Sequence, residues 1–477
     1  MQIRGRTEGW QNSLYCNYIL FCMPSMESIN PSTGELVESF PMHNSEAVRD
    51  RLENSYRAFL EWKFLDVDVR CDYLCQVAGM LRQCKQECAE LITREMGKPI
   101  KQSLGEIEKC AETFDYYADR TPSLMESRVE DTDATYSSVF FEPMGPVLCI
   151  KPWNFPFWQV LSVASHILAG GNTILLKHSS SVPACALKIE EIMHQAGLPE
   201  GVFQTLLIDG KTASSLIPSD EIAAVSFTGG TEAGRRVAVG AASSLKKYVL
   251  ELGGSDPFVV LEGADVQRAA KTAVAARFIN TGQTCIAAKR FIVEEPLMEE
   301  FKKYFIEQTR RMKVGDPLEE DTDIGPLVRA EEMHRLGSQV ADSIEKGAKV
   351  ELDGGLVEGA GFFYSPVVLS GITDDMDVMR QETFGPVAPL ISVKDEDEAI
   401  KVANATPYGL GASIWGGDSD HLLEIGKRIQ AGVVGINGFF KPEACMPFGG
   451  MKQSGVGREL SDFGFYEFMH IRALKSF

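Results

Sequence analysis

Apolar positions recur at helical spacing between residues 44 and 119, which predicts a helical N-terminal layer. Ser45 is expected to open one helix, and the segment Met96-Gly-Lys-Pro99 to break another. Residues 135–141 instead alternate in polarity and are rich in strand-forming side chains, which is typical of an extended arm or hairpin. We expect this arm to be peripheral.

After Pro143 the pattern becomes strand, loop and helix, repeated. Strands are expected at residues 146–150, 172–176, 202–208 and 223–227, with helices near 160–169, 184–196 and 212–217. This alternation predicts a parallel sheet covered on both faces, as in a doubly wound nucleotide-binding domain. A second α/β region is expected at about 257–444, with strands at 257–261, 290–293, 387–393 and 433–437 and a charged helix near 297–312.

Composition narrows the class of protein. The 477 residues are 44% hydrophobic and 24% charged, which are globular values. The formal charge of −20 repels nucleic acid and anionic lipid, so neither is expected as a partner. No stretch reaches the roughly 18 apolar residues that cross a bilayer. Residues 1–25 carry a poor imitation of a signal peptide and are expected to be an extension outside the fold.

Eleven cysteines without framework spacing fit reduced thiols in a cytoplasmic protein. Cys71, Cys75, Cys84 and Cys88 form two pairs that a helix could present as metal-binding edges. On one continuous helix, however, the second pair would lie about 220° around the axis from the first. We therefore expect small buried side chains here and no metal site.

A glycine-rich turn, Phe227-Thr-Gly-Gly-Thr-Glu-Ala-Gly234, follows a predicted strand and precedes a helical run. Glycines at such a turn let main-chain N–H groups approach a pyrophosphate, and the helix N-terminus favours its charge. Taken alone, a plain βα turn explains this segment equally well.

Three further segments contain candidate catalytic residues. Asn154 lies in the proline-rich loop Lys151-Pro-Trp-Asn-Phe-Pro156, Glu251 lies between an apolar strand and a glycine pair, and Cys285 follows Gly282. Singly, Asn154 is better explained as a turn amide and Glu251 as a strand-end carboxylate. Together they could supply an oxyanion donor, a base and a nucleophile.

These segments, with Glu382-Thr-Phe-Gly-Pro386 and Pro447-Phe-Gly-Gly450, resemble the NAD(P)-dependent aldehyde dehydrogenase superfamily in order and separation. Leu250-Glu-Leu-Gly-Gly-Ser-Asp-Pro-Phe258 and Cys285-Ile-Ala-Ala-Lys-Arg290 are similar to its succinate-semialdehyde dehydrogenase branch. The resemblance implies an α/β fold with a Rossmann-type nucleotide-binding domain (26–120 and 142–253) and a catalytic domain (254–445). An oligomerisation element (121–141 and 459–477) is expected to form a homodimer or homotetramer.

The resemblance also implies a mechanism. The Cys285 thiolate attacks the aldehyde, and the side chain of Asn154 and the Cys285 main-chain N–H hold the oxyanion. Hydride passes to the nicotinamide, and water activated by Glu251 hydrolyses the thioester. The implied cofactor-binding residues are Trp153, Lys177, Ser180, Gly229, Gly230, Gly234, Leu252, Glu382 and Phe384.

The chain departs from the family pattern at two positions, one of which concerns the cofactor and the other the substrate. Ser180 stands where NAD-preferring relatives often carry a glutamate, and Ser beside Lys177 accepts a 2′-phosphate, so we expect use of NADP, in addition to or in preference to NAD. Relatives that oxidise succinic semialdehyde often hold its carboxylate with arginine, whereas this chain has Ser162 at one such position. Lys441 could substitute, or the aldehyde could be uncharged. The implied substrate residues are Phe155, Trp158, Ser162, Lys441 and Cys445.

Two alternatives remain at this point. Coenzyme A instead of water could resolve the thioester, although Glu251 argues for hydrolysis. A protein of this fold could also bind ligands without turnover.

Overall fold

The computed structural model describes residues 24–477, so nearly all of the predicted extension lies outside the described residues. A two-stranded antiparallel hairpin, β1 (Ser25–Asn30) and β2 (Glu35–Pro41), precedes four helices. The helices are α2 (Ser45–Trp62), α3 (Val67–Gln83), α4 (Lys85–Met96) and α5 (Ile100–Met125). The predicted helical layer is confirmed. Asn44 caps α2 by accepting a hydrogen bond from the Ala47 N–H (2.9 Å), and Gly97 ends α4 in the left-handed region (φ 78°).

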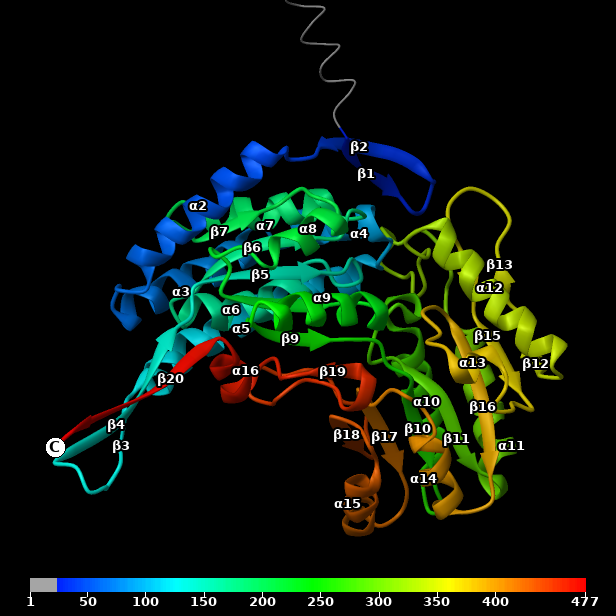
Figure 1. The fold of residues 1–477 in the computed structure, drawn as a ribbon. Coiled ribbons are helices and arrows are strands. Elements are labelled where there is room, and N and C mark those ends of the chain that lie inside the picture. The colour runs from blue at the N-terminus through cyan, green and yellow to red at the C-terminus, as the bar shows by residue number, and fades with distance from the viewer. Residues whose placement is uncertain (1–23) are drawn as a thin grey trace, which may run out of the picture.

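The first sheet has six strands in the order β19-β9-β8-β5-β6-β7 (Figure 1). Its strands are β5 (Pro146–Lys151), β6 (Thr173–His178), β7 (Phe203–Thr205), β8 (Ala224–Thr228), β9 (Lys247–Glu251) and β19 (Gly455–Val456). All pairs are parallel except β19 with β9. Between them run α6 (Trp158–Ala169), α7 (Pro183–Gln195), α8 (Gly210–Leu216) and α9 (Thr231–Ser243).

Alternate side chains of this sheet reach two different cores. Leu148 and Leu175 pack with apolar residues of α2, α8 and α9, whereas Val147 and Ile174 pack with those of α5, α6 and α7. Successive side chains of a strand point to opposite faces, so the short apolar runs bury both. The prediction of a parallel sheet covered on both faces is confirmed.

The second sheet has seven strands in the order β12-β15-β16-β11-β10-β17-β18, and only the β12 edge pairs antiparallel. Its strands are β10 (Asp256–Val260), β11 (Ala288–Glu294), β12 (Lys349–Leu352), β15 (Val367–Ser370), β16 (Val387–Val393), β17 (Gly411–Trp415) and β18 (Val433–Ile436). Its helices are α10 (Val266–Phe278), α11 (Glu295–Arg310), α12 (Ala330–Glu345), α13 (Asp377–Arg380), α14 (Glu396–Asn404) and α15 (Ser419–Arg428). A small hairpin joins β13 (Gly355–Leu356) to β14 (Tyr364–Ser365).

The arm is a three-stranded antiparallel sheet that projects from the body (Figure 1). The C-terminal strand β20 (Met469–Ser476), which follows α16 (Ser461–Glu467), pairs along its whole length with β4 (Tyr136–Pro143), and β4 also pairs with β3 (Arg128–Val129). The predicted start of this element at residue 121 is wrong, because α5 continues to Met125 with Thr121 and Leu124 buried.

The cysteine prediction needs a correction. Cys84 lies between α3 and α4, so the two pairs do not share one continuous helix, and Cys75 is exposed rather than buried. The Cys84 and Cys88 sulfurs are 3.6 Å apart. Across residues 24–477 there is no group of three or more metal-binding side chains. In the same residues, no helix is long and apolar enough to span a membrane.

Candidate active site

Cys285 lies on a loop whose backbone is held in an uncommon conformation. The preceding turn η1 (Ile279–Gly282) has left-handed Asn280 (φ 50°), Thr281 (φ 57°) and Gly282 (φ 76°). Such residues cost of order 1–3 kcal/mol each when they are not glycine, so their surroundings must fix them. The buried Asn280 amide does so by donating to the Asn154 carbonyl (2.7 Å) and the Gln283 carbonyl (3.2 Å). The turn therefore connects the loop that carries Cys285, here called the thiol loop, to the loop after β5.

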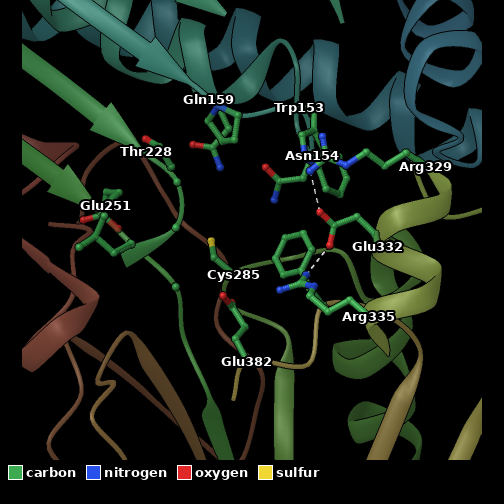
Figure 2. A pocket seen from close by; sticks show the side chains of 16 residues that line it. Trp153, Asn154, Gln159, Thr228, Glu251, Cys285, Arg329, Glu332, Arg335 and Glu382 are labelled. Carbon is green, nitrogen blue, oxygen red and sulfur yellow. Dashed lines mark hydrogen bonds and ion pairs between the residues drawn. The ribbon is translucent and has the colours of Figure 1, made fainter. Parts of the chain in front are cut away.

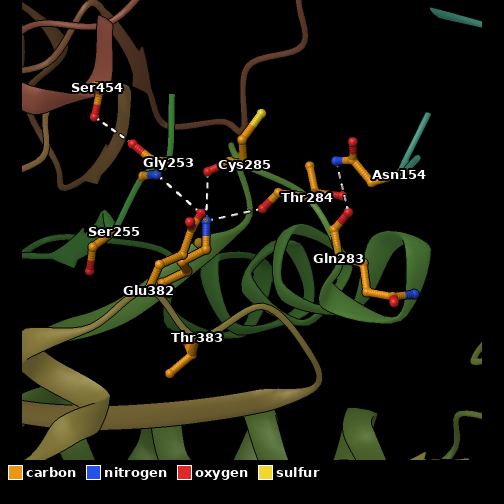
Figure 3. A network of polar contacts seen from close by, with 12 residues as sticks. Asn154, Gly253, Ser255, Gln283, Thr284, Cys285, Glu382, Thr383 and Ser454 are labelled. Carbon is orange, nitrogen blue, oxygen red and sulfur yellow. Dashed lines mark hydrogen bonds and ion pairs between the residues drawn. The ribbon is translucent and has the colours of Figure 1, made fainter. Parts of the chain in front are cut away.

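Lys289 fixes the other side of the same loop. Its buried ammonium group donates to the carbonyls of Cys285 (2.6 Å) and Thr284 (3.0 Å) and lies 3.2 Å from the Glu382 carboxylate. In Figure 3 the dashed contacts of Thr284, Cys285 and Glu382 meet at a single nitrogen, which is that of the Lys289 ammonium group. One cation thus connects the backbone of Cys285 to Glu382, a residue expected to bind the cofactor.

The glycine pair after β9 makes this approach possible. The Gly254 N–H donates to Glu382 (3.1 Å), and a Cβ at Gly253 would lie 2.4 Å from the same carboxylate (Figure 3). A Cβ at Gly254 would lie 2.7 Å from the Cys285 carbonyl. Both close contacts require glycine, which gives the Leu250-Glu-Leu-Gly-Gly254 motif a physical reason.

Asn154 directs its side-chain amide toward the thiol loop, where it donates to the Gln283 carbonyl (3.1 Å). An amide nitrogen carries two hydrogens, so one donor remains for a ligand. Figure 2 shows Asn154 and Cys285 on the same cavity, with Glu251 and Glu382 around it.

Glu251 ends β9 with its side chain buried and neither carboxylate oxygen hydrogen-bonded within the described structure. Burial raises the pKa of Glu251 well above its ordinary value, nearby Glu459 raises it further, and Lys151 lowers it. A Cβ at Gly449 would lie 2.9 Å from Glu251, so the glycine of Pro447-Phe-Gly-Gly450 leaves room for the carboxylate. Burial thus raises the proton affinity of this carboxylate, which suits a group that takes a proton during a reaction.

Burial likewise favours the protonated form of the Cys285 thiol. Burial raises its pKa to about 12, and the positive charge of Lys289 only partly opposes this. The thiolate that the resemblance implies is therefore not the resting form here, and it must arise when the proton is removed.

Two cavities meet at Cys285. The first, of about 310 Å³, is shown in Figure 2. It is lined by the predicted residues Trp153, Asn154, Gly229, Gly230, Glu251, Leu252, Cys285, Glu382 and Phe384. Sequence reasoning missed Gln159, Thr228, Arg329, Glu332 and Arg335, which also line it.

The second cavity, of about 290 Å³, shares Gln159 and Cys285 with the first. It includes the predicted Phe155, Trp158 and Lys441, together with the unpredicted Gln102 and Lys109 of α5. Ser162 and Cys445 are not among its lining residues; Ser162 is buried in α6 and Cys445 is exposed.

A third cavity of about 510 Å³ contains Lys177 and Ser180, and Arg329 lines both this cavity and the first. Burial lowers the pKa of Lys177, and Asp209 in the same cavity raises it. Gly234 lines none of the three; a Cβ there would lie 2.4 Å from Leu252, so it allows α9 to pack closely on that side chain.

Comparison with known proteins identifies the family of this chain. Residues 22–474 match the model of the aldehyde dehydrogenase family. The chain is 44% identical to a probable succinate-semialdehyde dehydrogenase [NADP(+)] of Synechocystis sp., over 94% of this chain and 99% of that protein. It is 40% identical to the succinate semialdehyde dehydrogenase [NAD(P)+] Sad of Escherichia coli, over 94% and 97%.

Solved structures give the same answer. The chain superposes with a TM-score of 0.92 on the succinic semialdehyde dehydrogenase of Streptococcus pyogenes in complex with NADP+, at 33% identity, covering 94% of this chain and 99% of that one. The chain therefore belongs to the aldehyde dehydrogenase family and is an NAD(P)-dependent aldehyde dehydrogenase similar to succinate-semialdehyde dehydrogenases.

Proposed function

We propose that this protein oxidises succinic semialdehyde or a similar short aldehyde to its carboxylate, with NADP as the preferred cofactor. The observation that carries the proposal is the position of Cys285 between two cavities. One cavity contains the residues expected to hold a dinucleotide, and the other can admit an aldehyde from a different direction.

In the first half of the reaction, the Cys285 sulfur bonds to the aldehyde carbon and the thiol proton passes to a base. Solvent water is the proposed acceptor of this proton, and Glu251 is assigned to the second half of the reaction. The Asn154 amide and the Cys285 N–H are proposed to hold the new oxyanion.

In the second half, a thioester on Cys285 is hydrolysed. When bound, the dinucleotide supplies the hydride acceptor for this chemistry. Glu251 removes a proton from water, the resulting hydroxide attacks the thioester carbon, and the carbon–sulfur bond breaks to release the carboxylate and the Cys285 thiolate. A buried carboxylate in this position favours hydrolysis over transfer to coenzyme A.

The residues of the first and third cavities suit a dinucleotide. The 13-residue helix α9 begins without a side-chain cap directly after Gly230, which lines the first cavity, so its first N–H groups can bind a pyrophosphate there. Lys177 and the exposed Ser180 can hold a phosphate on the adenosine ribose. Asp209 accepts a hydrogen bond from the Thr212 N–H (2.7 Å) as the cap of α8, so part of its charge is already compensated.

Cofactor preference gives a direct prediction. Replacing Ser180 by glutamate should lower kcat/KM for NADP by about 100-fold, because a carboxylate would repel the 2′-phosphate, and should raise kcat/KM for NAD. Steady-state kinetics with both cofactors test this. Ser180→Gln is the matched neutral control and should retain the preference for NADP. A wild-type enzyme with far lower kcat/KM for NADP than for NAD would contradict the proposal.

The arm supports a proposal on assembly. Strand β20 pairs with β4 on one side, and Ile471 and Leu474 are 64% and 53% exposed. We propose that this element joins two copies of the chain, and that residues 26–120 with 142–253 bind the cofactor while 254–445 carry the catalytic loop. Sedimentation of the full chain distinguishes a dimer or tetramer from a monomer.

The activity itself is tested by adding succinic semialdehyde with NADP or NAD and following the reduced cofactor. Mass spectrometry of the quenched enzyme should find an acyl group on the peptide that contains Cys285. A folded, reduced preparation that gives neither product with any aldehyde would refute the proposed function and favour a binding protein.

A further inference from the structure

Two lysines on the second cavity lack an anionic partner. Lys109 of α5 and Lys441 of the loop after β18 both line it, and neither forms an ion pair with any of residues 24–477. Lys109 instead lies over the ring of Trp158, 3.8 Å from its centroid. Its ammonium group therefore lies against an aromatic face, and its N–H donors that point away from the ring remain available to an anion.

The carboxylates of this cavity do not supply the missing charge. Glu106 pairs with the fully buried Lys98 and accepts hydrogen bonds from the N–H groups of Phe157 and Trp158, each 2.9 Å long. Glu459 pairs with the buried Lys151 at 3.0 Å. Each lining carboxylate is thus matched by its own lysine, and the uncompensated charges of the lining are the two ammonium groups.

The placement of these lysines separates them from the thiol. Gln102, Glu106 and Lys109 are spaced three to four residues apart, so they share one face of α5, whereas Cys285 comes from the loop before β11. Lys441 is exposed although it lines the cavity, so the cavity meets solvent at this side. An aldehyde that reaches Cys285 from solvent would pass these charges, with Phe155 and Trp158 along its carbon chain.

We propose that Lys109, assisted by Lys441, binds the distal carboxylate of an aldehyde whose other end reacts at Cys285. The inference rests on the proposed function and names its substrate class: short, unbranched aldehydes with a terminal carboxylate. It assigns to α5 the anion-binding role that Ser162, buried in α6, does not fill. A local positive pair is needed for such a substrate because the whole chain carries a charge of −20 and repels anions.

The pKa of Lys109 predicts a pH dependence for this interaction. Burial lowers the pKa of Lys109 to about 8, and Lys441 lowers it as well, whereas Cys110, Glu106 and Glu443 raise it. The ammonium form is therefore present below pH 8 and is lost above it. The ratio of kcat/KM for succinic semialdehyde to kcat/KM for pentanal should fall as pH rises through about 8, since groups that serve both substrates cancel in the ratio.

The decisive variant is Lys109→Met, which keeps an unbranched side chain of similar length beside Trp158 and removes the charge. We expect KM for succinic semialdehyde to rise about 10- to 100-fold, the usual worth of a charged hydrogen bond, while kcat/KM for pentanal stays unchanged. Lys441→Met should raise KM about 2- to 5-fold, since that lysine is exposed. Lys109→Arg should keep the preference for the carboxylate and move its pH dependence above pH 8.

The matched control is Lys101→Met. Lys101 lies on α5, pairs with Asp323 at the surface and does not line the cavity, so its loss changes net charge equally without changing the substrate preference. Thermal unfolding of each variant checks that α5 still folds.

A second measurement does not need turnover. Succinate, at concentrations that protect the wild-type Cys285 from iodoacetamide, should fail to protect it in Lys109→Met. Three results would overturn the inference and leave the proposed function standing: equal losses of kcat/KM for both aldehydes in Lys109→Met, unchanged kinetics in a variant that combines Lys109→Met with Lys441→Met, or a wild type that prefers pentanal. Absence of reduced cofactor with every aldehyde would instead refute the proposed function, and protection by succinate would then decide the inference alone.

Discussion

Substitution of Cys285 by alanine is expected to abolish aldehyde oxidation, with kcat lower by on the order of 10⁵-fold, because removal of a nucleophile eliminates the covalent pathway. The sulfur lines both cavities, and no other cysteine of residues 24–477 lines either of them. The measurement is reduced-cofactor formation with succinic semialdehyde, together with mass spectrometry of the quenched enzyme.

The matched comparison is Cys149→Ala. Cys149 is a buried thiol of β5 that packs in the core and lines neither cavity, so its loss tests whether a smaller side chain alone affects turnover. Dinucleotide binding, followed by fluorescence, should persist in Cys285→Ala. Residual turnover in Cys285→Ala within tenfold of wild type would show that another group carries the reaction.

Much of the fold could be predicted because its strands are buried on both faces. Continuous apolar runs such as Val147–Ile150 have few alternatives to a buried parallel strand, and their spacing leaves room for one helix between them. The end of α5 could not be predicted in the same way. Pro122 normally discourages a helix, yet α5 continues past it because Thr121 and Leu124 are buried by tertiary packing.

The residues of the candidate site also differ in whether the sequence alone could identify them. Asn154, Glu251 and Cys285 stand in short segments whose glycines and prolines mark them, so the sequence alone could identify them. Lys109 and Arg329 have no such local mark. They reach the cavities from α5 and from the residue before α12, and a single lysine or arginine in a helical region looks like a solvent-facing charge until the fold is known.

The role of Lys289 could not be predicted from the sequence either. It belongs to the segment that resembles succinate-semialdehyde dehydrogenases, but its role depends on the left-handed turn that directs the Thr284 and Cys285 carbonyls toward it. Three successive positive φ angles with only one glycine could not be foreseen from residue types.

The electrostatics of the site separate two kinds of buried charge. Lys98 and Lys151 are paired with carboxylates, which offsets the cost of taking both ions out of water. Glu251 and Cys285 have no such partner, and burial raises the pKa of each. Burial therefore disfavours the charged form of both groups.

Glu251→Gln is expected to separate the two halves of that reaction. Glutamine preserves the volume of the side chain but cannot accept the proton of water, so hydrolysis of the thioester should slow by about 10²- to 10⁴-fold. Rapid mixing should show an initial burst of reduced cofactor no larger than the number of sites, followed by a slow phase. The acyl group should accumulate on Cys285 during that slow phase.

The pH dependence of acyl-enzyme decay identifies the base. Because burial raises the pKa of Glu251, the carboxylate is neutral and inactive at low pH, and the wild-type decay rate should rise with pH as this group loses its proton. In Glu251→Gln the rise should disappear over the same range. The thiol does not complicate this measurement, since it is esterified until the step is complete. If decay in Glu251→Gln equals that of wild type in water, another base acts; if only coenzyme A accelerates wild-type decay, the acyl group is transferred rather than hydrolysed.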